Sequence, residues 1–176
     1  MLRKLVLLLL MYTFAVPAHA APTEYQLKAV FLLNFARYTT WPDASLPDEA
    51  PIDICVIGRD PFGPHLAGLE SRQAQGHAVR VHFPASPAEA RACAVVFVAA
   101  SEQRRLNVIL RELAGAPVLT VSDIEGFVEA GGAIGFVTQD DRVRFDINRD
   151  TLGRDGLRLS AQLLKLARRL LGDGER

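Results

Sequence analysis

Residues with the types and spacing needed for catalysis or metal binding are sparse in this chain. Beyond the N-terminal segment the histidines are His65, His77 and His82, and none forms an H-x-H or H-x-x-x-H pattern. The sequence also lacks the G-x-S-x-G pentapeptide that presents a nucleophilic serine on a sharp turn. We therefore expect no metal, no cofactor and no enzymatic activity, and we expect a protein that acts by binding.

Cys55 and Cys93 are the only cysteines and carry the clearest chemical prediction. Cys55 lies inside the apolar run 52–57, and Cys93 opens the apolar run 94–98, so a bridge would tie two strands together. No further Cys or His lies nearby at the spacing of a zinc site. In an oxidising compartment we expect a disulfide, worth about 4 kcal/mol on the chain-entropy model. The alternative is two buried thiols.

The first twenty residues predict export. Arg3 and Lys4 precede an apolar run over 5–16, which is shorter than the roughly 20 residues that a membrane-spanning helix needs. Ala18 and Ala20 supply an A-x-A cleavage site. We expect a signal peptide over residues 1–20 that is cleaved after Ala20, and a single periplasmic domain over residues 21–176. The alternative is an uncleaved N-terminal anchor.

The charge balance argues against a nucleic-acid partner. The chain has 20 basic and 20 acidic side chains, and loss of Arg3 and Lys4 with the signal leaves the mature domain slightly acidic. Phosphate binding needs a basic surface instead. The C-terminal segment does carry a group of cations: Arg158, Lys165, Arg168 and Arg169. They could meet an acidic partner or anionic lipid, or they could complement a helix dipole and solvate its outer face.

Two other positions allow a binding interpretation. The loop over 58–63 follows a predicted strand at the place where flavodoxin-like folds often bind ligands, and Gly58 could open an anion-binding turn. Asp60-Pro61 equally fits the N-cap and first turn of a helix. Asn34 falls on the apolar side of the first predicted helix, so if it is buried it needs a hydrogen-bond partner from the backbone or from a ligand.

The hydrophobic pattern predicts an α/β domain. An amphipathic helix capped by Thr23 is expected over residues 24–38, with apolar residues at three- and four-residue steps: Leu27, Val30, Phe31, Phe35 and Tyr38. After a proline-rich connection over 42–51, strands are expected at 52–57, 78–83, 94–99 and 118–121, with a helix at 102–114. This alternation is typical of a three-layer fold with a mostly parallel sheet, and a flavodoxin-like strand order is our first choice.

The pattern changes after Gly131-Gly132. Segments 133–137 and 142–148 are separated by the short polar turn Gln139-Asp140-Asp141, which predicts a C-terminal antiparallel hairpin. The chain is then expected to close with one flanking helix over 156–171. Its core-facing stripe would consist of Leu159, Leu163, Leu166 and Leu170.

Three segments together resemble the YfiR family of periplasmic regulators. They are YQLKAVFLLNFARY (25–38) with Trp41-Pro42, LTVSD (119–123) with Gly131-Gly132, and VRFDIN (143–148) leading into the leucine-rich C-terminal segment. The likeness spans the whole mature chain. The pair Cys55 and Cys93 is also similar to the family's inter-strand disulfide, whereas a second bridge seen in some members has no cysteines here.

The resemblance implies a regulator that represses a membrane-bound diguanylate cyclase by binding its periplasmic region, and so lowers cyclic di-GMP and biofilm formation. It also implies an outer-membrane lipoprotein that can sequester the regulator, and it leaves a homodimer open. The candidate ligand- or partner-binding residues are Asn34, Arg37, Trp41, Arg144 and Asn148. The alternative function is a periplasmic small-molecule sensing or solute-binding domain. A closed polar pocket near Asn34, Trp41 and Asn148 would favour that alternative, and an exposed apolar patch would favour a protein partner.

Overall fold

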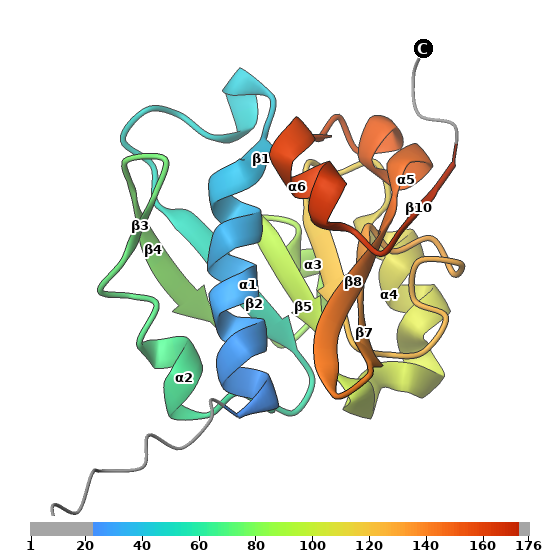
Figure 1. The fold of residues 1–176 in the computed structure, drawn as a ribbon. Helices are drawn as coiled ribbons and strands as arrows, with labels where there is room; N and C mark the ends of the chain where they lie inside the picture. The colour runs from blue at the N-terminus through green and yellow to red at the C-terminus, as the bar shows by residue number, and fades with distance from the viewer. Residues whose placement is uncertain (1–22, 173–176) are drawn as a thin grey trace, which may run out of the picture.

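Short strands and helices alternate along the chain in the computed structural model, which describes residues 23–172 (Figure 1). The first part contains α1 (Glu24–Tyr38), β1 (Thr39–Thr40), the 3-10 helix η3 (Asp43–Ser45), β2 (Ile52–Ile57), α2 (Pro64–Ala67), β3 (Gln73–Ala74), β4 (His77–His82), α3 (Pro87–Ala90) and β5 (Val95–Val98). The second part contains the 3-10 helix η4 (Ala100–Arg105), α4 (Leu106–Leu113), β6 (Leu119–Ser122), β7 (Ile134–Gln139), β8 (Arg142–Asn148), α5 (Arg149–Arg154), β9 (Arg158–Leu159), α6 (Ala161–Leu166) and β10 (Arg169–Leu171).

The strand order confirms the predicted flavodoxin-like arrangement. Eight strands form one sheet in the order β10-β8-β7-β6-β5-β2-β4-β3. Strands β4, β2, β5, β6 and β7 are parallel to their neighbours within that group, and the first of them along the chain, β2, lies between the second and the third. Strands β3 and β8 pair antiparallel at the two sides of this group, and β1 pairs with β9 in a separate two-stranded sheet.

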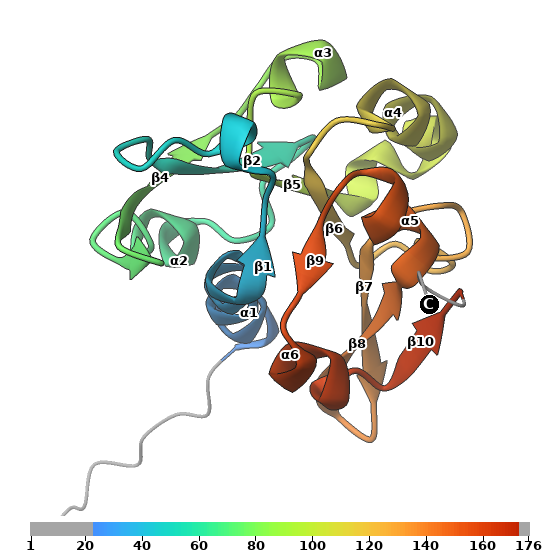
Figure 2. The same cartoon turned by 90° about the horizontal axis from the view of Figure 1, so that it is seen from above.

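The three-layer architecture is also confirmed. Seen from above, α1 and α2 lie on one face of the sheet and α3 and α4 on the other (Figure 2). The central strands are buried on both faces, as a parallel sheet between helix layers requires: all four residues of β5 and all four of β6 are buried. One apolar cluster joins α1 to the sheet through Phe35, and a second joins α4 to the sheet through Ile109.

The predicted disulfide is present and belongs to the second cluster. Cys55 lies in β2 and Cys93 lies two residues before β5, with a Cα–Cα separation of 6.1 Å. Both residues are buried. The bridge therefore joins two neighbouring strands at the centre of the sheet, one of them through the turn that leads into it.

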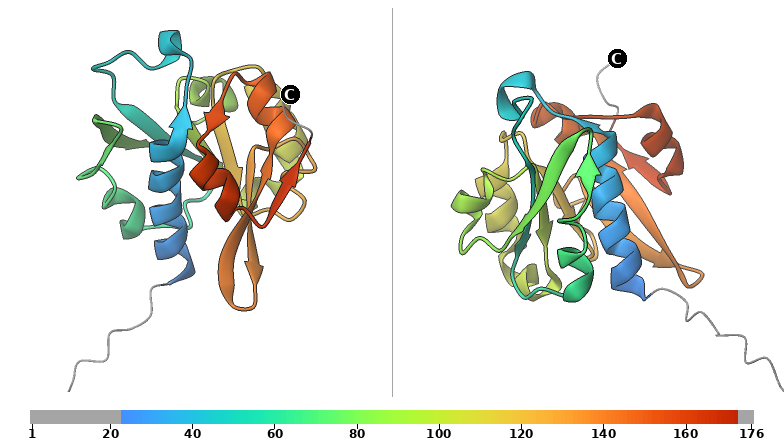
Figure 3. Two further views of the ribbon diagram at one scale, coloured as in Figure 1. Left: turned by 45° about the horizontal axis from the view of Figure 1, so that its top comes forward. Right: turned by 90° about the vertical axis from the view of Figure 1, so that its left-hand side faces the viewer.

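The predicted hairpin is formed by β7 and β8, which extend past the neighbouring strands (Figure 3, left). Their register pairs Gln139 with Arg142, so Asp140 and Asp141 alone make the turn. Both have a positive φ, 49° and 56°, as a two-residue type I′ turn requires. The other expected elements are found with their bounds unchanged or shifted by at most two residues, except that the first part of the predicted helix 102–114 is 3-10 in form.

The prediction of one helix over 156–171 is wrong. That segment forms β9, the six-residue α6 and then β10, which pairs parallel to β8. Of the four leucines expected to form the core-facing stripe, Leu163 is buried and Leu159 is half-buried, whereas Leu166 is 60% and Leu170 43% exposed. The outer edge of β8 offers unpaired backbone groups to residues 169–171, and this tertiary pairing overrides the helical spacing of the leucines.

Candidate functional site

Helix α1 carries apolar residues on both its inner and its outer side. Thr23 caps its start by accepting a hydrogen bond from the Gln26 N–H at 3.2 Å. Its buried residues are Lys28, Ala29, Leu32, Leu33, Phe35 and Ala36. The predicted apolar stripe is therefore only partly a core stripe. Leu27 is 36%, Val30 50% and Tyr38 38% exposed, which leaves an outer apolar face on this helix.

A groove of about 400 Å³ runs between α1 and α2, beside this outer face. Its floor contains the buried side chains of Ala29, Leu33 and Leu69, and Val30 lies at its side. The other lining residues are Gln26, Arg37, Pro64, His65, Gly68 and Arg72. The lining thus combines an apolar floor with cationic or titratable basic side chains and contains no acidic residue. We call this surface the α1–α2 groove.

Asn34 and Arg37, two of the five predicted site residues, lie on α1. Asn34 is half-buried. Arg37 is exposed, lines the α1–α2 groove and donates from Nε to the carbonyl of Gln73 at 3.2 Å. Its remaining N–H groups face no acidic side chain within ion-pair distance among residues 23–172. Arg37 is therefore free to meet an anionic group while it keeps its backbone contact.

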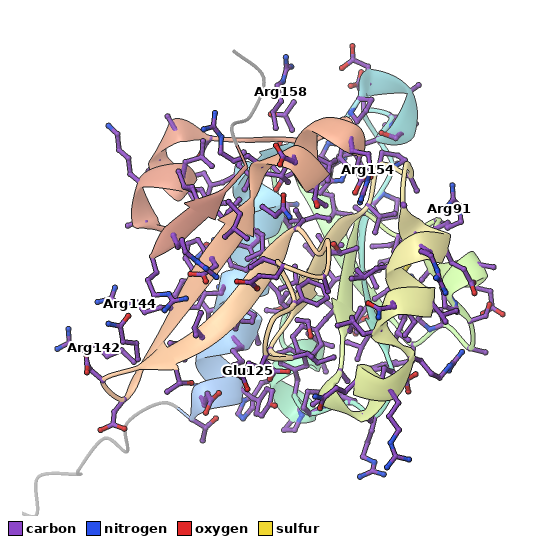
Figure 4. All side chains as sticks on the ribbon, turned by 90° about the vertical axis from the view of Figure 1, so that its right-hand side faces the viewer. Arg91, Glu125, Arg142, Arg144, Arg154 and Arg158 are labelled. Carbon is purple, nitrogen blue, oxygen red and sulfur yellow. A yellow bond between two sulfur atoms is a disulfide. The ribbon has the colours of Figure 1, made fainter. Side chains whose placement is uncertain are left out.

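The other three predicted site residues lie elsewhere. Trp41 is buried and donates from Nε1 to the carbonyl of Ala94 at 3.2 Å. Asn148 caps α5, because its Oδ1 accepts from the Thr151 N–H at 3.0 Å while its Nδ2 donates to Val128 at 2.8 Å. Arg144 is exposed on the β7–β8 hairpin, where Figure 4 shows it beside Arg142. No hydrogen bond among the described residues joins two of the five, and their role in binding stays a prediction.

A buried ionic network fixes the inner side of α1 and was missed by sequence reasoning. Asp123, directly after β6, accepts hydrogen bonds at Oδ2 from Tyr25 at 2.8 Å and from Lys28 at 2.7 Å. Burial, followed by the hydrogen bond to Asp123, raises the pKa of Tyr25 above its ordinary value. The signal in the sequence was a lysine among the apolar residues of α1. Oδ1 of Asp123 is buried without a hydrogen-bond partner in the described part of the chain.

A second network holds the C-terminal strand. Asp146 of β8 is buried, and its carboxylate accepts from Arg168 at 2.5 and 2.8 Å and from Arg169 at 2.9 and 3.1 Å. Arg169 also pairs with Glu129. Burial acts to raise the pKa of Asp146, but the hydrogen bonds from both arginines outweigh it and leave that pKa below its ordinary value. These two arginines are therefore engaged within the protein, not arrayed on a helix as expected.

The cavity beside this network, about 530 Å³, lies between segment 123–129 and strand β7. Its charged lining residues include Glu125, Glu129 and Asp146 as well as both arginines. Neither this cavity nor the α1–α2 groove is lined by Asn34, Trp41 or Asn148, and the same holds for two further hollows, one around Leu157 and one around Phe83. The closed polar pocket that would favour a solute-binding domain is thus not among these four.

Asp60, His77 and His82 have structural partners. Asp60 accepts from the N–H groups of Phe62 at 2.8 Å and Gly63 at 3.1 Å and so holds the turn before α2. The expectation that Asp60-Pro61 forms the N-cap and first turn of this helix is wrong, because Gly63 is the N-cap and Pro64 begins the helix. His77 contacts the carbonyl of Ala50 and His82 contacts Asp53. Within residues 23–172 no three His, Cys, Asp or Glu side chains are grouped to hold a metal ion. In the same range no helix is long and apolar enough to cross a membrane.

Comparison with known proteins gives one family and one fold. A family model described as YfiR/HmsC-like matches residues 25–168. The fold is similar to the crystal structure of a conserved domain protein from Vibrio cholerae O1 biovar eltor str. N16961, with a TM-score of 0.53 and 11% sequence identity. That similarity covers 84% of this chain and 60% of the other, so the chain spans about three fifths of that protein. At this identity the likeness concerns the fold alone.

Proposed function

Because the chain belongs to the YfiR/HmsC-like family of periplasmic regulators, we propose that it represses a membrane-bound diguanylate cyclase by binding the cyclase's periplasmic region. Cyclic di-GMP and biofilm formation would then fall when the regulator is bound. An outer-membrane lipoprotein that sequesters the regulator would relieve the repression. The predicted signal peptide, which lies outside the described residues, and the disulfide both agree with a periplasmic location.

The main observation in favour of a protein partner is the exposed apolar surface on the outer face of α1. Leu27, Val30 and Tyr38 leave the apolar surface of one helix exposed to water, and the α1–α2 groove continues that surface. Exposed apolar surface of this kind is typical of protein-interaction sites, because its burial against a partner is favourable. A binding role also fits a regulatory family.

Binding alone is sufficient to carry a signal across the membrane. The cyclase must exist in two conformations, and the regulator must prefer the inactive one. A tenfold shift in that equilibrium needs about 1.4 kcal/mol of differential affinity. A few apolar contacts on α1 would supply a difference of this size.

The test is genetic and uses the full-length chain. Deleting the gene should raise cyclic di-GMP, and the complete chain should restore the low level. A chain without residues 1–20 should fail to restore it, because the cyclase's binding region lies outside the cytoplasm.

Two controls exclude trivial failures. A chain with an unrelated export signal in place of residues 1–20 should restore repression. A chain kept in the reducing cytoplasm would also lack its disulfide, and this loss could by itself abolish repression. An exported double variant Cys55→Ala/Cys93→Ala tests this point, because it lacks the disulfide but reaches the same compartment as the unaltered chain. Unchanged cyclic di-GMP after deletion would contradict the proposal.

The second candidate is a periplasmic small-molecule sensing domain. The cavity of about 530 Å³ with Arg168 and Arg169 in its wall favours it, because such a hollow can admit a small polar ligand. This function would be preferred if deletion left cyclic di-GMP unchanged while the purified protein bound a small solute tightly.

A further inference from the structure

We infer that the α1–α2 groove binds an acidic amphipathic segment of the protein partner, with the apolar side of that segment on the groove floor. This inference rests on the proposed function, since it names the surface and the partner chemistry through which the regulator acts. It is drawn from the shape, the apolar floor and the charge of the groove, and each of these limits the occupant.

The concave shape and apolar floor of the α1–α2 groove favour a partner segment with protruding apolar side chains. Ala29, Leu33 and Leu69 form a continuous apolar floor, and each is at most 6% exposed because the groove walls and neighbouring elements cover it. Val30, by contrast, is half exposed at the side of the groove. A partner helix places apolar side chains in a row at three- and four-residue steps, and such a row fits between two helices.

The basic side chains that line the α1–α2 groove favour a partner segment with acidic residues. Arg37, Arg72 and His65 line the groove and no Asp or Glu does. This concentration of basic groups contrasts with a mature chain that holds 18 basic and 20 acidic side chains once Arg3 and Lys4 are removed. Within residues 23–172, Arg72 has no acidic side chain within ion-pair distance, as is also true of Arg37. Carboxylates beside the partner's apolar row would complement both guanidinium groups.

An anionic membrane is the competing occupant and fits less well. A lipid surface is broad and attracts clusters of cations on a convex or flat face. Here the apolar residues form a concave floor and only two arginines flank it. A ridge of side chains from a protein segment fills such a groove, whereas a flat headgroup layer leaves the groove unfilled.

The first experiment tests the chemistry without the cyclase. The purified mature protein, residues 21–176, is titrated with a fluorescent amphipathic helical peptide built from Leu and Glu, and with a twin that has Lys in place of Glu. The acidic peptide should bind, and its affinity should fall as salt is raised. Equal binding of the two peptides would overturn the charge argument. Tighter binding to phosphatidylglycerol vesicles than to the acidic peptide would assign the groove to membrane instead.

The second experiment locates the site with matched variants. Val30→Glu and Arg72→Glu should each weaken acidic-peptide binding by about tenfold or more. Val108→Glu and Arg104→Glu introduce the same changes at exposed positions of α4 and η4, on the opposite face of the sheet, and should leave the affinity within about twofold. Equal losses in the groove and control variants would overturn the assignment.

The third experiment separates failure of the groove from failure of the proposed function. The same four variants are expressed with the full export signal in the deletion strain, and cyclic di-GMP is measured. Loss of repression with Val30→Glu and Arg72→Glu alone supports the inference. If all four variants repress like the unaltered chain, the groove is not the contact surface although the function holds. If the unaltered chain does not repress, the proposed function fails, and the peptide titration still decides the chemistry of the groove.

Discussion

At the centre of the sheet, β2 and β5 are buried on both faces and linked by Cys55 and Cys93, whereas at its C-terminal edge β10 pairs with β8 over three residues and through charged side chains. The stabilisation from apolar burial and from a covalent bond changes little with salt concentration or with moderate changes in pH. The stabilisation from ion pairs between partly exposed groups falls as salt concentration rises or as one partner loses its charge. We therefore expect the centre to unfold only globally and the edge to open locally.

The largest effect should come from removing the disulfide. The double variant Cys55→Ala/Cys93→Ala should lose about 4 kcal/mol of unfolding free energy, because the bridge closes a loop of 38 residues in the unfolded chain. Urea unfolding measures it, and a reducing agent should destabilise the unaltered protein by a similar amount while leaving the variant unchanged. A loss below about 1 kcal/mol would mean that the centre does not depend on its covalent link.

A smaller loss is expected at the edge. Asp146→Asn removes the charge that Arg168 and Arg169 share, and should cost about 2 kcal/mol, a value already reduced because the two guanidinium side chains are 36% and 47% exposed. Hydrogen exchange should rise in residues 169–171 and stay slow in β2 and β5. Asp48→Asn, at an exposed position, is the control. Uniformly faster exchange throughout the sheet would contradict local opening.

Acid should weaken the edge before the centre. A hydrogen bond from Arg169 lowers the pKa of Glu129, and the net effect at Asp146 is also a lowered pKa. Carboxyls with a pKa lowered by folding stabilise the protein above their unfolded pKa, about 4, and lose that contribution as the pH falls through the folded value. The stability difference between the unaltered protein and Asp146→Asn, measured in urea, should therefore shrink from pH 6 toward about pH 3. A difference independent of pH would contradict this assignment.

The smallest effect is expected at the tip of the β7–β8 hairpin. Asp140 and Asp141 both have positive φ, a backbone conformation that Gly adopts freely and that Asn and Asp adopt more readily than most other residues, though at a steric cost. In the β3–β4 hairpin, Gln75 also has positive φ, but its side chain donates to the carbonyls of Ala36 and Thr39 at 2.8 Å and so supports the end of α1.

Asp141→Gly should accordingly stabilise the protein by about 0.5 kcal/mol, because Gly adopts this conformation without steric cost. Urea unfolding would register the gain as a higher midpoint. A Gln75→Ala variant should instead lose stability, since two carbonyls lose their donor. A loss with Asp141→Gly would show that its carboxylate makes a stabilising contact.

The C-terminal segment shows where sequence patterns misled. Leucines at 159, 163, 166 and 170 have helical spacing, yet only Leu163 is buried. The capping Ser160 starts a helix at Ala161, but Ala167 is extended and the chain then joins β8. Spacing within a segment cannot reveal that a distant strand has an open edge or that Asp146 lies opposite Arg169.

The sequence by itself determined the α/β class, the order of most elements, the hairpin and the two cysteines that meet, because each follows from local hydrophobic period, turn residues or composition. The tertiary structure alone decided which side of α1 faces water, since residues on both sides are apolar and the sheet, α2 and Asp123 compete for them. It also decided that Trp41 and Asn148 hold backbone groups, and that Arg37 and Arg72 line one groove. These contacts join residues far apart in the chain, and their energies depend on the packing of the whole fold, which no single segment specifies.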